Sequence, residues 1–200
     1  IVEMTSGCLC CTIRGDIRET LLSLHGQRER NKIPRFKRLV VESTGLADPA
    51  PVIHTLISDP SLDSRYMLGG VITTVDAING AATLDAHIEC EKQAAVADRL
   101  VITKTDLATD LISKKELEKL KRKLMELNPE AVILSRHDSN FEHHRLFDTS
   151  LYNPETKTIN VRKWLGSEAE KLDHDYHHHG HESHDHSHEH SHKGCKEEDP

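Results

Sequence analysis

Hydrophobic positions recur with two different periods along the chain, and the changes of period predict strands separated by helices. Short apolar runs bounded by polar or turn residues are typical of buried strands. Apolar residues that recur every three or four positions indicate amphipathic helices. The apolar runs predict strands at residues 1–4, 38–42, 68–75, 99–102 and 131–134.

Helical periodicity fills the intervals between these runs. Apolar residues recur with the helical period over residues 15–25, and Asp48, which precedes a proline, is a typical helix start. Residues 78–97 indicate a helix in two pieces, and the spacing of Ser113 and Glu116 matches a capping box that opens a longer helix. The apolar face of that longer helix consists of Leu117, Leu120, Leu124 and Leu127.

Alternating strands and helices predict an α/β fold of three layers, with a mostly parallel sheet and helices on both of its faces. Ligands of such sheets bind beyond the carboxyl ends of the strands. The cysteines near the N-terminus follow the first predicted strand, and other polar or small residues follow later ones. We therefore expect these later residues to converge with the cysteines on one edge of the sheet: Glu42, Gly45, Asp76, Lys104 and Asp106.

Composition and charge narrow the class of protein. The 200 residues are 36% hydrophobic and carry a net charge of −7. No basic stripe with interleaved aromatic residues is present, which argues against nucleic-acid binding, and no apolar run has the length of a membrane span. Few, clustered cysteines favour a reducing compartment, the cytoplasm or the nucleus. Because the chain starts at Ile1 within a predicted strand, we expect an N-terminal segment to be missing.

Three of the five cysteines lie within four consecutive positions, at Cys8, Cys10 and Cys11. Thiolates are soft ligands that zinc and copper(I) prefer, and Gly7 permits the turn that brings all three to one ion. Three thiolates leave one position of a tetrahedral zinc shell open, which suits a site that hands its metal on. A disulfide-forming cluster or a set of small buried residues is the alternative.

Residues 174–192 hold ten of the 16 histidines, interleaved with acidic and small residues. Neutral imidazoles bind zinc, nickel, copper and cobalt, so this tract predicts a metal collector with several sites. A solvated linker is the alternative, since the tract lacks the apolar residues that would offset the entropy of ordering. The candidate ligands are His177, His179, His181, His184, His186, His188 and His190.

An ordered set of short motifs gives the chain a family resemblance. The motifs are GCLCC at 7–11, ESTGLADP at 42–49, VDA at 75–77, ADR at 97–99 and TKTD at 103–106. In this order they resemble the motifs of the CobW-type GTPases, relatives of the metallochaperones UreG and HypB. The resemblance extends from the first residue to the region of Leu165. It implies a P-loop NTPase fold and a GTPase that delivers metals, zinc and cobalt among them, to target proteins.

The resemblance also implies roles for residues of the first two motifs. Cys8, Cys10 and Cys11 match the metal-binding cysteines of the family. Glu42 matches the acidic residue that holds the magnesium of the nucleotide through water. Gly45 matches the glycine whose backbone senses the γ-phosphate in a switch loop.

Guanine recognition is implied for the loop over residues 103–106. Asp106 matches the residue that accepts hydrogen bonds from guanine N1–H and the exocyclic amine, and the stem of Lys104 covers the base plane. Thr103 stands where GTPases usually have Asn, which weakens the expected contact with guanine N7. Ser135, after the last predicted strand, is assigned to a further base-contacting loop.

Two parts of the family pattern have no counterpart in the sequence. No Gly-x-x-x-x-Gly-Lys-[Ser/Thr] loop is present to bind the phosphates, which agrees with a missing N-terminal segment. The C-terminal domain of the family is only begun, with a strand expected over Thr158–Trp164. We divide the chain into a partial GTPase domain, a linker or start of the C-terminal domain, and a disordered histidine-rich tail, at 1–150, 151–170 and 171–200.

These observations predict a GTP-dependent metal chaperone that uses GTP, Mg²⁺ and preferably Zn²⁺, with Co²⁺ or Ni²⁺ as other cargo. Hydrolysis of GTP would release the metal from the cysteine loop to a client protein. We expect no nucleic-acid or membrane partner and leave formation of a homodimer open. A passive metal store or sensor with a non-functional nucleotide site is the alternative. Without a phosphate loop, residues 1–200 alone should be inactive.

Overall fold

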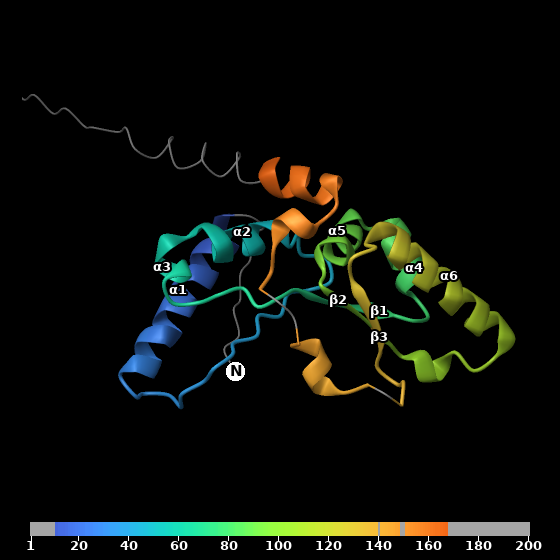
Figure 1. Cartoon of the computed structure of the whole chain (residues 1–200), viewed down its shortest axis with the longest axis horizontal. Coiled ribbons are helices and arrows are strands. Elements are labelled where there is room, and N and C mark those ends of the chain that lie inside the picture. The colour runs from blue at the N-terminus through green and yellow to red at the C-terminus, as the bar shows by residue number, and fades with distance from the viewer. Residues whose placement is uncertain (1–10, 140, 149–150, 168–200) are drawn as a thin grey trace, which may run out of the picture.

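Strands and helices alternate along the chain, as the hydrophobic pattern predicts (Figure 1). The computed structural model describes residues 11–139, 141–148 and 151–167, with side chains from Gly15 onward. The strands are β1 (Ile72–Asp76), β2 (Arg99–Thr103) and β3 (Val132–Ser135). The α-helices are α1 (Cys11–Glu29), α2 (Ala50–Ser58), α3 (Pro60–Asp63), α4 (Gly80–Ala86), α5 (Ile88–Val96) and α6 (Leu111–Leu127). Short 3-10 helices are η1 (Thr105–Leu107), η2 (His143–Leu146) and η3 (Pro154–Thr156).

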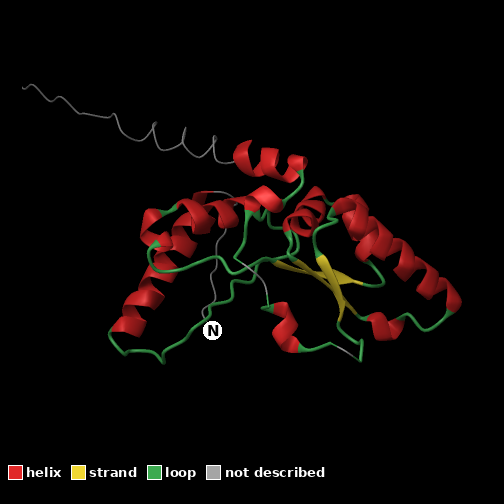
Figure 2. Cartoon of the chain, viewed as in Figure 1, coloured by secondary structure: helices red, strands yellow, loops and turns green. Residues whose placement is uncertain are grey.

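The three strands form a parallel sheet in the order β1-β2-β3. Figure 2 shows them in yellow beside α4, α5 and α6, with α1, α2 and α3 grouped on the other side of the molecule. Val75 lies opposite Ile102 in the register, and Leu100 precedes Ile102 by two residues, so these three side chains share one face. They pack there against α4, α5 and α6. The buried residues of this cluster are Val75, Ala77, Leu84, Ala94, Ala97, Leu100, Ile102, Leu120 and Leu124.

Helix α6 buries its predicted leucine face against the sheet, with Leu120 1% exposed. The start of the helix differs from the prediction, because Asp110 and not Ser113 is the N-cap. The Asp110 carboxylate accepts hydrogen bonds from the amides of Ile112 and Ser113 at 2.8 and 2.9 Å. It thereby satisfies two of the amides that the first turn of a helix leaves unpaired.

The prediction of a strand over residues 38–42 is wrong. These residues form no strand, and Val40 and Val41 are 69% and 41% exposed. An apolar run becomes a strand only where a neighbouring strand offers hydrogen-bond partners. Within the described ranges, no strand pairs with this segment. The run predicted over 68–75 forms a strand only from Ile72, and the one over 1–4 lies outside the described residues.

The prediction of a strand over Thr158–Trp164 is also wrong, because residues 159–167 are helical. The alternation of Ile159 and Val161 resembles a strand, but the buried pair is Val161 and Leu165, one helical turn apart. This helix packs on α2 and on the end of α5. The buried residues of this second cluster are Ala50, Ile53, Ala95, Val96, Tyr152, Val161 and Leu165.

A buried asparagine closes the end of α5. Asn128, 2% exposed, follows α6, and its Nδ2 lies 2.9, 3.0 and 2.9 Å from the carbonyl oxygens of Ala94, Ala95 and Ala97. The last carbonyls of a helix have no partner within the helix, so a buried end needs donors from elsewhere. The Asn128 amide supplies them and fixes α5 against the start of β3.

We expect Asn128→Ala to lower the free energy of unfolding of residues 1–200 by about 2–4 kcal/mol, because buried carbonyls would lose their donor. Urea denaturation followed by circular dichroism measures this change. Asn160→Ala, at an exposed helical position, is the control and should alter the free energy by less than about 0.5 kcal/mol. A loss no larger than that of the control would show that Asn128 does not secure α5.

Candidate functional site

The carboxyl ends of the three strands bring polar residues to one edge of the sheet. In the register, Asp76 lies opposite Thr103, and Ser135 lies opposite Ile102. The loop after β2 carries Lys104 and continues into η1. Of the residues predicted to converge, Asp76 and Lys104 meet at this edge, and the loop of Lys104 continues to Asp106. Ser135 at the end of β3 joins the same edge through Thr105.

Asp76 at the end of β1 receives hydrogen bonds from one side chain and two amides. Lys104 Nζ lies 2.6 Å from its Oδ2, and the backbone nitrogens of Ile78 and Asn79 lie 2.8 and 3.1 Å from its Oδ1. Burial of the carboxyl raises its pKa, but the hydrogen bonds from Lys104 and the two amides outweigh burial and lower the pKa to about 2. Asp76 is therefore ionised at neutral pH and holds Lys104 beside the sheet.

Lys104 has a left-handed backbone conformation, with φ 57° and ψ 25°. Residues with a Cβ adopt this conformation rarely, at a cost on the order of 1 kcal/mol. The ion pair with Asp76 and the hydrogen bond from the Leu107 amide to the Lys104 carbonyl, at 3.1 Å, hold the turn in place. The turn directs the chain from β2 into η1, which carries Asp106.

Asp106 belongs to a polar group that joins the loops after β2 and β3. Its Oδ1 lies 3.2 Å from His137 Nδ1, while its side chain stays 53% exposed. Thr105 Oγ1 lies 3.1 Å from Ser135 Oγ and 3.3 Å from His137 Nδ1. The structure thus places Asp106 and Ser135, both predicted to contact the base, in one connected group.

His137 is a member of this group that the sequence analysis missed. Its position two residues after Ser135, in the loop that follows a predicted strand, was the available signal. A strand pattern specifies which loop a residue occupies but not which side chain it contacts, so the pairing with Asp106 required the structure.

Gly45 lies in the turn before α2, and this turn is held against α5. Cys90 Sγ is 3.2 Å from the Gly45 carbonyl oxygen. Gln93 Nε2 donates to the carbonyl oxygens of Thr44 and Ala47 at 2.9 and 2.8 Å. These contacts attach the Gly45 turn to α5. None of them involves the loop after β2.

Glu42 lies in the extended segment that leads to this turn and is exposed. Because residues 38–42 do not join the sheet, no strand register places Glu42 at the edge formed by β1, β2 and β3, and its role stays a prediction. Its carboxylate is open to solvent, as a water-mediated ligand of a metal ion would be.

The predicted metal ligands fall outside the described side chains. Cys8, Cys10 and the tract at 174–192 lie outside the described residues, and Cys11 is described only as the first backbone residue of α1. Among the side chains that the structure describes, no three His, Cys, Asp or Glu residues form a group that could hold a metal ion. In the same part of the chain, no helix combines the length and apolarity needed to cross a bilayer.

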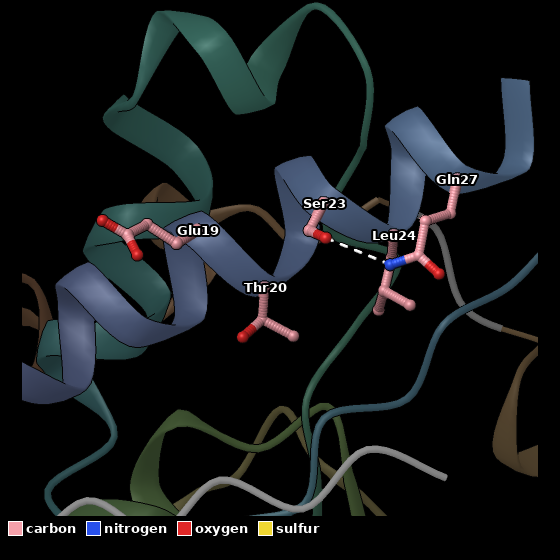
Figure 3. Close-up of a pocket in the computed structure, with 5 residues that line it drawn as sticks. All are labelled: Glu19, Thr20, Ser23, Leu24 and Gln27. Atoms are coloured by element: carbon pink, nitrogen blue, oxygen red, sulfur yellow. Dashed lines mark hydrogen bonds between the residues drawn. The ribbon is translucent and has the colours of Figure 1, made fainter. Parts of the chain in front are cut away.

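A shallow hollow on α1 has no place in this site (Figure 3). It is lined by residues of this one helix, and Gln27 Nε2 donates to Ser23 Oγ across it at 3.1 Å. Glu19 is its one ionisable residue. We assign no ligand to this hollow.

Asp76→Asn should destabilise the chain at pH 7, and the difference from wild type should shrink as the pH falls from about 4 to about 2. A carboxyl whose pKa falls from 3.8 to about 2 on folding stabilises the fold above its unfolded pKa. That stability is lost as the pH falls through the folded pKa. Urea denaturation across this range measures the difference, with exposed Asp63→Asn as the control. A difference that stays constant from pH 7 to pH 2 would contradict the assigned pKa.

Alignments with two relatives cover most of this chain but only part of each relative. The Zinc chaperone YjiA of Escherichia coli (strain K12) is 33% identical over 162 residues, which are 81% of this chain and 49% of that protein. The Zinc-regulated GTPase metalloprotein activator 1 of Schizosaccharomyces pombe is 30% identical over 138 residues, 66% of this chain and 30% of that protein. The chain therefore spans half or less of the length of these relatives.

Solved structures and a family profile agree with these relatives. The crystal structure of Zn(II)-bound YjiA GTPase from E. coli matches with a TM-score of 0.57 and 30% identity, over 73% of this chain and 46% of that chain. A Zn(II)-bound triple mutant of YjiA GTPase matches with the same TM-score and 34% identity, over 66% of this chain and 39% of that chain. The profile described as "CobW/HypB/UreG, nucleotide-binding domain" matches residues 1–135. The chain therefore belongs to the CobW/HypB/UreG family and carries its nucleotide-binding domain.

Proposed function

We propose that this chain is part of a GTP-dependent chaperone that carries zinc to a client protein. The observation that carries the proposal is the loop after β2. There Lys104 is fixed by Asp76, and Asp106 stands half exposed beside Ser135 and His137 at the ligand-binding edge of a parallel sheet. Relatives described as a zinc chaperone and a zinc-regulated GTPase support it.

The proposed base site reads guanine through Asp106. An ionised carboxylate accepts two hydrogen bonds, from guanine N1–H and from the exocyclic amine, and adenine does not offer that pair of donors. The apolar stem of Lys104 covers the base plane. Thr103 Oγ1 donates to the Val75 carbonyl oxygen at 3.3 Å, so its single proton is already engaged. We infer that Thr103 contributes little to guanine N7 and that selectivity rests on Asp106.

The proposed phosphate site uses Gly45 and Glu42. The Gly45 amide would donate to the γ-phosphate, and the Glu42 carboxylate would hold Mg²⁺ through water. Carboxylate oxygen is a ligand type that Mg²⁺ prefers, and the exposed position of Glu42 leaves room for the intervening water. The ion supplies positive charge to the phosphates when bound.

The proposed zinc site is the cysteine loop, with Cys8, Cys10 and Cys11 as ligands. The loop leads directly into α1, which packs on α2 and α3 through Ile17, Leu21 and Leu62. Binding of GTP would order this loop together with the Gly45 turn, and hydrolysis would relax both and release zinc to the client. The histidine tract would collect further zinc at weaker sites. Reduced thiols suit the cytoplasm or the nucleus.

We also propose that residues 1–200 alone do not turn over GTP. Their sequence contains no Gly-x-x-x-x-Gly-Lys-[Ser/Thr] loop, and phosphate contacts provide most of the charge stabilisation in P-loop catalysis. A passive zinc store would also lack turnover. A longer form of the protein with a phosphate loop separates the two, because zinc should stimulate GTP hydrolysis in a chaperone and not in a store.

Asp106→Asn in such a longer form should weaken GTP binding about 100-fold or more and improve binding of xanthosine triphosphate. The change removes the charge and replaces one of the two acceptor oxygens that face guanine N1–H and the exocyclic amine by an amide donor, and charged hydrogen bonds of this kind are worth about 1.5–3 kcal/mol each. Titration calorimetry measures the affinities of wild type and variant for GTP and for xanthosine triphosphate. Asp63→Asn, an exposed carboxylate on α3, should leave both affinities unchanged. Equal GTP affinity in wild type and Asp106→Asn would show that this loop does not read the base.

Simultaneous Cys8→Ser, Cys10→Ser and Cys11→Ser should abolish one tight zinc site, while deletion of residues 174–192 should remove only weaker sites. The tract should also lose zinc below about pH 6.5, where imidazoles protonate. Competition with a chromogenic chelator gives the stoichiometry and affinity of each variant. Cys90→Ser is the control for loss of a thiol elsewhere. An unchanged tight site in the triple-serine variant would remove the cysteine loop from the proposal.

A further inference from the structure

Three side chains of α5 hold the turn that contains Gly45. Gln93 Nε2 donates to the carbonyl oxygens of Thr44 and Ala47 at 2.9 and 2.8 Å, and the Cys90 thiol contacts the Gly45 carbonyl oxygen at 3.2 Å. Lys92 Nζ forms an ion pair with Asp48 Oδ2 at 2.6 Å. Three carbonyl groups of the turn, those of Thr44, Gly45 and Ala47, thus accept hydrogen bonds from one helix.

The direction of the Thr44 carbonyl sets that of the Gly45 amide, and its oxygen accepts hydrogen bonds from Gln93 Nε2 at 2.9 Å and, within the turn, from the Ala47 amide at 3.1 Å. A trans peptide is planar, and its C=O and N–H point in opposite directions. The peptide that ends at Gly45 N contains the Thr44 carbonyl, which points toward Gln93. The Gly45 N–H therefore points away from α5. The bond within the turn does not attach it to α5; the two hydrogen bonds from Gln93, to the carbonyl oxygens of Thr44 and Ala47, hold both ends of the turn on that helix.

Helix α5 is itself held in position by contacts with the sheet and with Asn128. The backbone carbonyl of Gln93 accepts a hydrogen bond from Thr73 Oγ1 of β1 at 2.7 Å. The residues that follow Gln93, Ala94 and Ala95, are buried, and Asn128 caps the end of the helix. The Gln93 side chain itself is only partly exposed. The position of its amide is consequently set by the sheet and the core.

We propose that Gln93 is a positioning residue for the phosphate-sensing amide of Gly45. This inference rests on the proposed GTPase function and names the residue that orients one part of its site. Gln93 acts through the Thr44 peptide and need not touch the nucleotide. Its removal should loosen the Gly45 turn and reduce the distinction between nucleotides with and without a γ-phosphate, while recognition of guanine at Asp106 is unaffected.

The test uses Gln93→Glu and Gln93→Met, two substitutions of similar size that lack the donor. Gln27→Glu, in which a partly exposed glutamine of α1, far from the Gly45 turn in sequence, undergoes the same chemical change, is the matched control. The first readout is hydrogen–deuterium exchange of the peptide covering residues 43–48 in the 200-residue chain. We expect exchange at least about 10-fold faster in both Gln93 variants and unchanged in the control. Exchange that stays at the wild-type rate in variants with wild-type circular dichroism would overturn the proposal.

The second readout is the ratio of affinities for GTPγS and GDP in a longer form that contains a phosphate loop. We expect the ratio to fall at least about fivefold in the Gln93 variants, with GDP affinity retained. Equal losses for both nucleotides would indicate a merely structural role and overturn the proposal, as would an unchanged ratio. If wild type itself did not bind guanine nucleotides, the proposed function would fail and the nucleotide role of Gln93 with it. The exchange readout would still decide whether Gln93 holds the turn.

Discussion

The satisfied carbonyl groups at the end of α5 are the constraint on which the described structure most depends. They are buried between α6, the sheet and the helix at 159–167, where water cannot hydrogen-bond to them. The two N–H groups of Asn128 are shared among three of these carbonyls, and Lys157 Nζ adds a hydrogen bond to Ala97 at 3.1 Å. Lys157 is itself buried and paired with Asp98 at 2.5 Å, directly before β2. The end of α5 and the start of β2 are therefore fixed by the same polar contacts.

This arrangement gives the two halves of the candidate site different supports. The proposed base side lies at the ends of β1, β2 and β3, where Asp76, Lys104 and Asp106 are held by neighbours from the sheet loops. The proposed phosphate side depends on the Gly45 turn, which follows no strand in the described part of the chain and is held by side chains of α5. Lys92 of α5 contacts both Asp48 in this turn and the Trp164 ring, 4.7 Å from its centroid. A movement of the turn would thus displace Lys92 and change its contact with Trp164 in the helix at 159–167.

Sequence patterns predicted the parts of the fold that depend on local periodicity. The strands β2 and β3, the division of residues 78–97 into two helices and the apolar face of α6 follow from such patterns. The strand at 38–42 failed because apolar character does not provide a neighbour for pairing. The polar groups at the ends of β1 and β2 could be located by their place after strands. His137 and Gln93 could not, because their importance lies in contacts across about 30 to 50 residues of sequence, as between Gln93 and Thr44.

The central claim, that GTP hydrolysis drives release of zinc from the cysteine loop, is tested most directly by following zinc transfer in one turnover. A longer form of the protein with a phosphate loop is loaded with one zinc and mixed with a chromogenic chelator, with GTP or with GTPγS. The account predicts rapid transfer with GTP, at the rate of phosphate release, and retention of zinc with GTPγS. Transfer at equal rates with both nucleotides would contradict it.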